Sequence, residues 1–202
     1  MSLVPPRAAA GTRDLLAPIA RRLHAMGVSA NAVTVTGFFL TVAGAAFLAA
    51  GHPLRALAVL VFGALADTLD GQIAKAAGGG TKLGAFLDST FDRLSDSVLT
   101  GAAVAYGAYN DDPFVFWAAL LALVGGSLIP YIRAKAESLG VAASIGLAPR
   151  EARLLLFIIG VAAWAVTGNS QLFAAALAVV AFLSTVTTVQ RIAHVARALR
   201  NT

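Results

Sequence analysis

Two pairs of aspartates, Asp67 with Asp70 and Asp88 with Asp92, lie in segments that are otherwise mostly apolar. On a helix the members of the first pair are about 60° apart and those of the second about 40°, so each pair projects from one face. A short Gly-Gly-Gly-Thr connection at residues 78–81 makes the two helices antiparallel neighbours. Converging carboxylates repel one another unless a cation lies between them, and ligation by oxygen alone suits Mg²⁺ or Mn²⁺. The spacing therefore predicts a divalent-metal site.

A purely structural role is the alternative for these aspartates. They could pair with Arg93, Lys75 or Lys82 and hold a helical bundle together. Carboxylates inside a membrane are costly, which makes several on adjacent helices hard to explain by structure alone. Asp96 differs from the others, because pairing with Arg93 is a sufficient explanation for it. We therefore favour the metal site for the two pairs and a structural role for Asp96.

The composition of the chain predicts that this site lies in a membrane protein. Apolar residues make up 58% of the 202 residues and charged residues 12%, and the mean hydropathy is +0.80. Residues 23–54 and 154–190 contain no Asp, Glu, Lys or Arg. The chain has no Cys, which excludes disulfides, zinc–cysteine sites and thiol catalysis. The net charge of +5 indicates anchoring beside anionic lipid, with no nucleic-acid partner.

Turn signals divide the chain into an all-α polytopic membrane protein, which we expect to form a single domain over residues 1–202. We expect six transmembrane helices, since each crossing takes roughly 20 apolar residues. Residues 12–26 form an amphipathic pattern that predicts a juxtamembrane helix at the interface. Residues 1–11 lack the apolar core of a signal peptide. The expected spans lie near residues 30–50, 55–76, 82–108, 113–138, 150–167 and 170–197.

The basic residues predict the orientation. Every Lys and Arg except Arg55 falls in the termini or toward the helix ends that adjoin the 78–81 and 140–149 connections. Basic residues concentrate on the cytoplasmic side of a membrane. We therefore expect a multi-pass protein of the cytoplasmic membrane, with both termini and the aspartates on the cytoplasmic side.

The aspartate segments carry a longer motif. It reads Asp67-Thr-Leu-Asp70-Gly71-Gln-Ile-Ala74-Lys75 and then Gly84-Ala-Phe-Leu-Asp88-Ser-Thr-Phe-Asp92. This resembles the signature of the CDP-alcohol phosphotransferases, D-x2-D-G-x2-A-R-x8-G-x3-D-x3-D. Every fixed position matches except that Lys75 replaces the Arg. Lysine keeps the charge but loses the planar, bidentate guanidinium.

The resemblance implies a reaction. Members of this family transfer a substituted phosphoryl group from a CDP-linked donor to an alcohol and release CMP, and they are commonly homodimers. By similarity, Asp67, Asp70 and Asp88 bind two divalent ions that hold the pyrophosphate. Asp92 helps to bind the metal and acts as the general base toward the acceptor hydroxyl.

The resemblance also implies contacts with the donor, CDP-diacylglycerol. Residues 29–34 read Ser-Ala-Asn-Ala-Val-Thr and resemble a T-P-N-x-x-T stretch of the family, in which Asn31 and Thr34 match. Taken alone, those two residues are also typical of a helix N-terminus. The small residues of the motif permit close helix packing, and they would also let a nucleotide approach the backbone. The expected donor contacts are Asn31, Thr34, Gly71, Ala74, Lys75, Thr81 and Gly84.

Basic residues from three further helices favour an acceptor that carries a phosphate. Lys135, Arg153 and Arg191 lie at the depth of the aspartates, where a cluster of cations suits a phosphate. Ordinary membrane anchoring is the alternative for each of them taken alone. Within the family, residues 87–96 and 131–137 look most like the actinobacterial phosphatidylinositol phosphate synthases. That resemblance implies inositol 1-phosphate as the acceptor.

Two other functions stay open at this point. Phosphatidylglycerophosphate synthase also uses a phosphorylated alcohol, glycerol 3-phosphate. An ion or proton transporter could use intramembrane aspartates as well, although these lie near one surface and no inverted repeat is visible.

Overall fold

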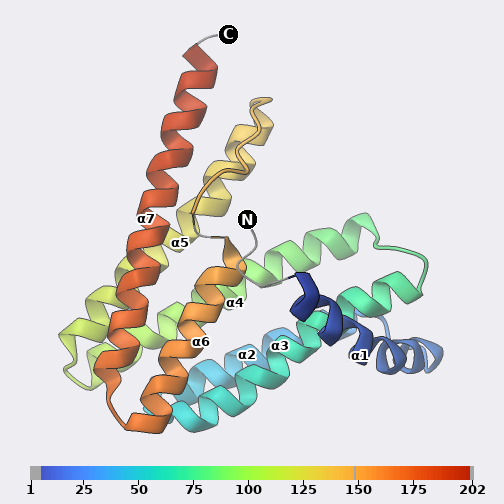
Figure 1. Ribbon diagram of the computed structural model, residues 1–202, viewed down its shortest axis with the longest axis horizontal. Helices are drawn as coiled ribbons and strands as arrows, with labels where there is room; N and C mark the ends of the chain where they lie inside the picture. The colour runs from blue at the N-terminus through green and yellow to red at the C-terminus, as the bar shows by residue number, and fades with distance from the viewer. Residues whose placement is uncertain (1–5, 148, 201–202) are drawn as a thin grey trace. The chain divides into compact units, whose positions relative to one another are not determined.

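The computed structural model describes residues 6–147 and 149–200, with side chains from residue 16 onward (Figure 1). The N-terminal residues 1–5, on which part of the signal-peptide argument rests, lie outside this range, as do the side chains of residues 12–15. The described part of the chain is helical and contains no strand, which confirms the all-α class. Its helices are α1 (Pro6–Ala25), α2 (Ala30–Ala49), α3 (Pro53–Ala76), α4 (Lys82–Tyr109), α5 (Pro113–Ser138), α6 (Arg150–Thr167) and α7 (Ser170–Arg200).

Proline, glycine and a capping aspartate set several helix ends. Pro53 and Pro113 occupy the first positions of α3 and α5, where the missing N–H costs nothing. Asp112 caps α5, because its Oδ1 accepts the N–H of Val115 at 3.1 Å. Gly168 ends α6 with a φ of 72°, and its N–H donates to the carbonyl of Trp164. As a result, α2 to α7 coincide with the six expected segments to within three residues at either end.

Four of the helices, α2, α3, α5 and α7, are long and apolar enough to cross a membrane. This supports the membrane class predicted from the composition. The charged residues of α4 and α6 lower the hydropathy of those two helices, so six crossings stay a prediction. In α1, Ala20 is buried while Arg21, Arg22 and His24 are exposed. Its expected position at the membrane interface is likewise still a prediction.

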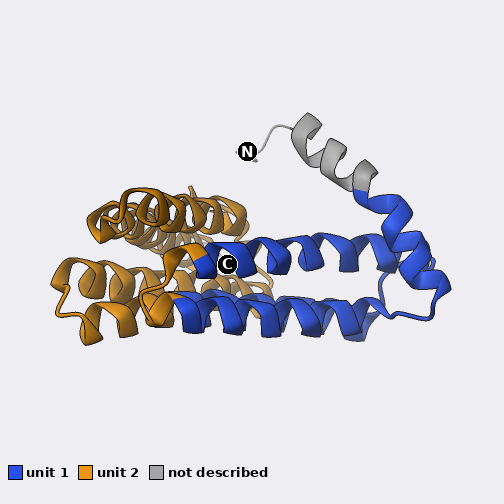
Figure 2. Cartoon of the chain, turned by 90° about the horizontal axis from the view of Figure 1, so that it is seen from below, with its two compact units in different colours: residues 1–47, 55–99 blue, residues 48–54, 100–202 orange. Residues whose placement is uncertain are grey.

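The chain divides into two compact units (Figure 2). Unit 1 comprises residues 1–47 and 55–99, and unit 2 comprises residues 48–54 and 100–202. Unit 1 therefore holds α1, most of α2 and α3 and the first part of α4, with all the aspartates of the motif. Unit 2 holds α5, α6 and α7, with the three cations expected to bind the acceptor.

Small residues bring α2 and α3 together in unit 1. A Cβ added to Gly37 would lie 3.2 Å from that of Ala66, and one added to Gly63 would lie 3.3 Å from Oγ1 of Thr41. The rings of Phe38 on α2 and Phe91 on α4 are 5.1 Å apart. Close approach of this kind lets short side chains of one helix reach the next.

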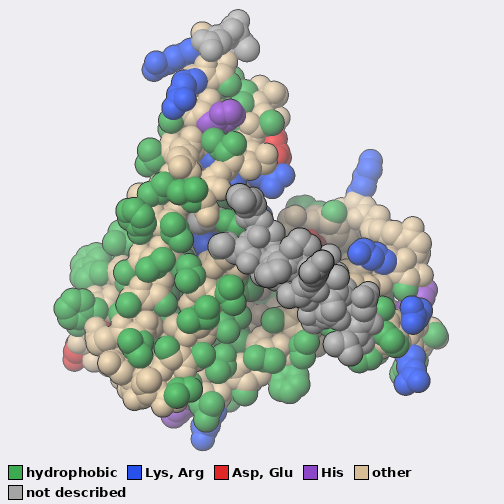
Figure 3. Space-filling view, in the orientation of Figure 1, with side chains coloured by type: hydrophobic (Ala, Val, Ile, Leu, Met, Phe, Trp, Pro, Cys, Tyr) green, Lys and Arg blue, Asp and Glu red, His purple; other side chains and the backbone are tan. Residues whose placement is uncertain are grey.

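Helix α7 packs against both α5 and α6 in unit 2. A Cβ on Gly125 would lie 3.0 Å from that of Ser184, and one on Gly160 would lie 2.7 Å from that of Ala176. Phe173 is fully buried and its ring lies 5.2 Å from that of Phe157. Many large hydrophobic side chains are exposed, and they cover much of the face drawn in Figure 3. Basic side chains are scattered around the edges of that face, and the last turn of α7 carries Arg197 and Arg200. Many exposed apolar side chains on long helices are typical of a helical membrane protein.

Candidate active site

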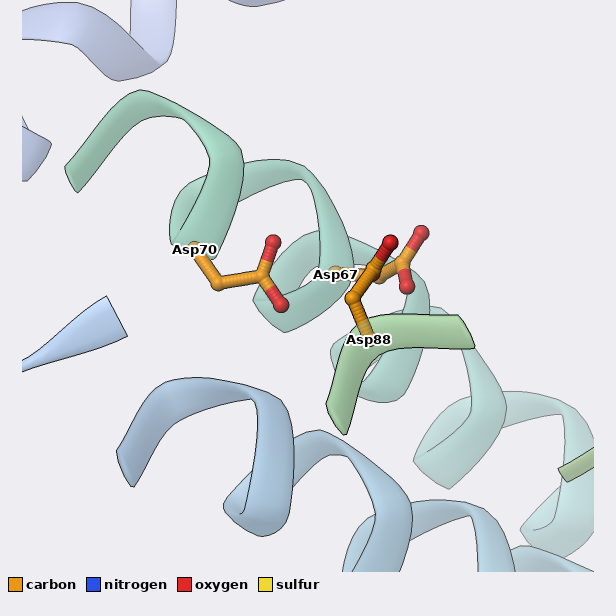
Figure 4. A group of neighbouring side chains, drawn as sticks. All are labelled: Asp67, Asp70 and Asp88. Atoms are coloured by element: carbon orange, nitrogen blue, oxygen red, sulfur yellow. The ribbon is translucent and has the colours of Figure 1, made fainter. Parts of the chain in front are cut away.

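Three carboxylates converge between α3 and α4. Asp67, Asp70 and Asp88 each offer one oxygen, and these oxygens all lie within 4.8 Å of one another. Figure 4 shows the three side chains pointing toward one another from their two helices. Asp70 is buried, while Asp67 and Asp88 are exposed. The group therefore has one buried member and two members that a ligand can reach.

The hairpin of α3 and α4 explains why these residues meet. Asp67 and Asp70 lie in the last part of α3, and Asp88 lies in the first part of α4. Gly78 and Gly79, with φ values of 91° and 126°, make the turn between the helices. The donor set consists of oxygen ligands alone, which fits Mg²⁺ or Mn²⁺. The structure thus brings together three of the four aspartates that the motif placed at a metal.

Asp92 lies one turn beyond Asp88 on α4 and is half-buried. It is not part of the group of three. Its expected roles as a metal ligand and as a base stay predictions. Asp96, one turn further on, is also half-buried, and its expected pairing with Arg93 is likewise a prediction.

The beginnings of α2 and α4 form a cradle of small and polar groups. Thr81 caps α4, because its Oγ1 accepts the N–H of Gly84 at 2.9 Å. A Cβ on Gly84 would lie 3.2 Å from that oxygen and 3.4 Å from Oδ1 of Asn31. The structure thus places three of the expected donor contacts, Asn31, Thr81 and Gly84, next to one another.

The remaining expected donor contacts on α3 follow the aspartates. No atom would come within 4 Å of a Cβ on Gly71, so the space beside this residue is open. Ala74 is half-buried, and Lys75 is exposed in the last turn of the helix. Small side chains beside carboxylates leave room for a bulky phosphate-bearing ligand. Lys75 can offer such a ligand a single positive charge.

Thr34 has a partner that the sequence did not indicate. Its Oγ1 lies 2.6 Å from Oδ2 of Asp70 and donates a hydrogen bond to it. We expected Thr34 to contact the donor nucleotide. The two residues are 36 positions apart, so no local pattern could have predicted their contact.

The three cations expected at the acceptor differ in their surroundings. Lys135 is exposed near the end of α5, whereas Arg153 is buried in the first part of α6. Arg191 is half-buried and donates from Nε to the carbonyl of Ile145 and from Nη1 to that of Ile129. A phosphate pocket shared by these residues stays a prediction.

The fold and the carboxylate group define a class of protein. A family model for CDP-alcohol phosphatidyltransferases matches residues 27–190. The chain therefore belongs to this family, as its motif predicted.

Two individual relatives are similar to this chain over most of its length. Archaetidylinositol phosphate synthase of Methanothermobacter thermautotrophicus is 34% identical over 188 residues, covering 93% of this chain and 92% of that protein. Phosphatidylinositol phosphate synthase of Mycobacterium tuberculosis is 38% identical over 163 residues, covering 79% and 75%. Both names contain an inositol phosphate, but one names an archaetidyl lipid and the other a phosphatidyl lipid.

Solved structures agree with the sequence relatives. The crystal structure of the Mycobacterium tuberculosis phosphatidylinositol phosphate synthase with CDP-DAG bound matches with a TM-score of 0.83 at 33% identity, covering 90% of this chain and 94% of that one. The same enzyme in complex with manganese and citrate also gives a TM-score of 0.83 at 33% identity, covering 89% and 88%.

Proposed function

We propose that this protein transfers the phosphatidyl group of CDP-diacylglycerol to the hydroxyl of inositol 1-phosphate, giving phosphatidylinositol phosphate and CMP. The observation that carries the proposal is the group of Asp67, Asp70 and Asp88, whose oxygens lie within 4.8 Å of one another in a chain of this family. A set of carboxylates at this separation suits divalent cations shared with a pyrophosphate. The relatives whose names contain an inositol phosphate support the choice of acceptor.

Mg²⁺ or Mn²⁺ fits the donor set. We propose that Asp67, Asp70 and Asp88, with help from Asp92, hold two such ions. When bound, the ions would neutralise the pyrophosphate and the charge that develops on the departing CMP. The manganese in the crystal structure of the Mycobacterium tuberculosis enzyme supports the assignment of a metal to this fold.

The chain's own residues bind the donor and move the proton. Asn31, Thr81 and Gly84 adjoin one another, and their polar atoms and small side chains suit a nucleotide. Gly71 and Ala74 leave room for the diphosphate, and the ammonium group of Lys75 lies at the end of the same helix. Asp92 lies outside the group of three and one turn away, where a carboxylate could accept the proton of the attacking hydroxyl.

We assign the acceptor's phosphate to Lys135, Arg153 and Arg191. A dianionic phosphate attracts several cations, and charge-assisted hydrogen bonds are stronger than neutral ones. A pocket of this kind favours a phosphorylated alcohol over free inositol or serine. Glycerol 3-phosphate would satisfy the same cations, so phosphatidylglycerophosphate synthase is the second candidate.

We further propose how the protein lies in the membrane. A helix of 28 residues such as α4 extends about 42 Å, longer than the roughly 30 Å hydrocarbon core. It can therefore cross the core while Asp88 and Asp92, near its beginning, stay close to the cytoplasmic surface. On this proposal α2 to α7 make six crossings as a single membrane domain, and α1 lies along the cytoplasmic face of the cell membrane. We also expect a homodimer, by similarity to the family.

An acceptor screen tests the proposed function. Purified protein in lipid vesicles would be given CDP-diacylglycerol, Mg²⁺ and one of four acceptors: inositol 1-phosphate, inositol, glycerol 3-phosphate or serine. We expect CMP release with inositol 1-phosphate and little with the others. CMP release with glycerol 3-phosphate alone would instead establish the second candidate. A protein that releases no CMP with any acceptor would contradict phosphatidyl transfer and leave ion transport as the explanation for the aspartates.

A further inference from the structure

The hydrogen bond between Thr34 and Asp70 lies directly behind the carboxylate group. Oγ1 of Thr34 is 2.6 Å from Oδ2 of Asp70 and 3.1 Å from the carbonyl oxygen of Ala30. A hydroxyl has one hydrogen to donate, and the shorter distance to an anionic oxygen favours Asp70 as its acceptor. The hydroxyl can then accept a hydrogen bond from a nucleotide but has no hydrogen left to donate to one.

This hydrogen bond restrains the carboxylate of Asp70. Asp70 is 7% exposed, so its side chain has little freedom to turn. Thr34 holds Oδ2 of this carboxylate, and Asp70 offers one oxygen to the group that it forms with Asp67 and Asp88. Partners that hold a ligating carboxylate in place commonly matter for metal affinity nearly as much as the ligand itself.

The first turns of α2 reach both helices that carry the aspartates. Thr34 contacts α3 at Asp70, and Asn31, one turn earlier, has its Oδ1 beside Gly84 at the beginning of α4. The close packing of Gly37 against Ala66 fixes α2 next to α3. Helix α2 is therefore positioned to keep the separation of the two helices, and hence of their carboxylates, constant.

We propose that Thr34 is a positioning residue of the metal centre, which acts by fixing the carboxylate of Asp70. The inference rests on the proposed function in so far as the aspartates bind a divalent cation. It differs from a role of Thr34 in nucleotide binding alone, because it requires an effect on metal affinity in the absence of any nucleotide.

Manganese binding without substrate tests this inference. Free Mn²⁺ would be followed by electron paramagnetic resonance during titration of the detergent-solubilised full chain. Thr34→Val removes the hydroxyl at nearly constant volume and should weaken Mn²⁺ binding about 10- to 100-fold. Thr34→Ser keeps the hydroxyl and should stay within about threefold of the wild-type Kd, since the same hydrogen bond can form.

Thr36→Val is the matched control. Thr36 lies on the same helix, is exposed, and donates only to the carbonyl of Ala32 within that helix, at 2.8 Å. Its replacement should leave the Mn²⁺ Kd unchanged, which separates the loss of a particular hydroxyl from a general disturbance of α2. Thermal unfolding of each variant would verify that the proteins compared are folded.

The outcomes separate the two proposals. If the wild type binds Mn²⁺ and Thr34→Val binds it equally well, Thr34 is no positioning residue, while the proposed function is unaffected. An unchanged Mn²⁺ Kd together with weaker CDP binding would reduce Thr34 to a nucleotide contact. If the wild type itself binds no Mn²⁺, the metal centre of the proposed function fails, and this inference fails with it.

Discussion

Arg191 donates from its Nε to the backbone carbonyl of Ile145, with the two atoms 2.8 Å apart. Arg191 is one of three residues on one face of α7 whose side chains contact the backbone of the connection between α5 and α6. Thr187 Oγ1 accepts the N–H of Leu147 at 3.2 Å, and Nε2 of His194 lies 3.1 Å from the carbonyl oxygen of Ala142. Gly146 is required in this connection, because its φ is 136° and a Cβ would overlap the side chain of Thr187.

This arrangement changes how the acceptor pocket should be tested. The guanidinium of Arg191 is held by two backbone carbonyls, those of Ile145 and Ile129. Removing it would disturb the connection that leads into α6, which carries Arg153, as well as any contact with a phosphate. Arg153 and Lys135 therefore give clearer tests than Arg191.

The first variant that tests the expected pocket for the acceptor's phosphate replaces Arg153. Arg153→Gln should raise the KM for inositol 1-phosphate about 10- to 150-fold, the equivalent of a charge-assisted hydrogen bond of about 1.5–3 kcal/mol. The KM for CDP-diacylglycerol should change little. Because Arg153 is buried, Lys135→Gln at an exposed position provides a second variant less prone to unfolding, with the same expected direction.

Arg133→Gln is the control for the pocket. Arg133 is exposed on the same helix end as Lys135 and pairs with Glu137 at 2.8 Å, so its loss should leave both substrate constants unchanged. If substitutions of Arg153, Lys135 and Arg191 all leave the acceptor KM within about twofold, the phosphate binds elsewhere.

Asp67→Asn should abolish activity and greatly weaken metal binding without unfolding the protein. Asp67 is exposed and lies among like charges, so replacing it by a neutral amide relieves repulsion when no ion is bound. Transfer assays and Mn²⁺ titration would be combined with thermal unfolding. Wild-type turnover in excess EDTA would contradict the requirement for a metal.

Asp92→Asn should separate binding from transfer. The variant should still bind CDP-diacylglycerol and metal, because Asp67, Asp70 and Asp88 are intact. Transfer should fall by about 10²- to 10⁴-fold, since the hydroxyl proton has no acceptor. The measurement is single-turnover CMP formation with saturating donor. Near-normal transfer would leave Asp92 as a ligand or a structural group.

We predict that Asp112 makes the stability of the folded protein depend on pH. Its partial burial works to raise its pKa, but hydrogen bonds from the N–H of Val115 and from the side chains of Ser170 and Gln171 lower the pKa below the usual range of an aspartate. A carboxyl whose pKa is lower in the folded state contributes stability above its unfolded pKa of about 3.9. That contribution is lost as the pH falls through the folded pKa.

Thermal unfolding of Asp112→Ala in detergent measures this contribution. At pH 7 the variant should be less stable by about 1–2 kcal/mol, as expected for the loss of a helix cap. The difference between variant and wild type should narrow as the pH falls below about 4, near the unfolded pKa. A difference that stays constant down to the lowest pH at which the protein remains folded would show that the charge of Asp112 contributes nothing.

The helices were predictable from the sequence because their ends are marked locally. Pro113 begins α5 and Gly168 ends α6, and both signals depend only on adjacent residues. The meeting of Asp67, Asp70 and Asp88 was predictable too, since a short turn forces two helices of known period together. In α1 the helix begins at Pro6, earlier than the amphipathic pattern indicated.

Contacts between distant residues were not predictable. Nothing near Thr34 in the sequence specifies Asp70, and nothing near Arg191 specifies the carbonyl of Ile145. Such pairs depend on how closely helices pack, which small residues such as Gly37 permit but do not specify on their own. The six crossings stay a prediction, because the charged residues of α4 and α6 lower the apolar character of those two helices.

A competition between acceptors tests the central claim most directly. Purified protein in vesicles would receive CDP-diacylglycerol, Mg²⁺ and equal concentrations of inositol 1-phosphate and glycerol 3-phosphate, and mass spectrometry would quantify the two lipid products. We predict that phosphatidylinositol phosphate predominates and that its amount matches the CMP released. Predominance of phosphatidylglycerophosphate, or CMP release without either lipid, would contradict the assignment of inositol 1-phosphate as the acceptor.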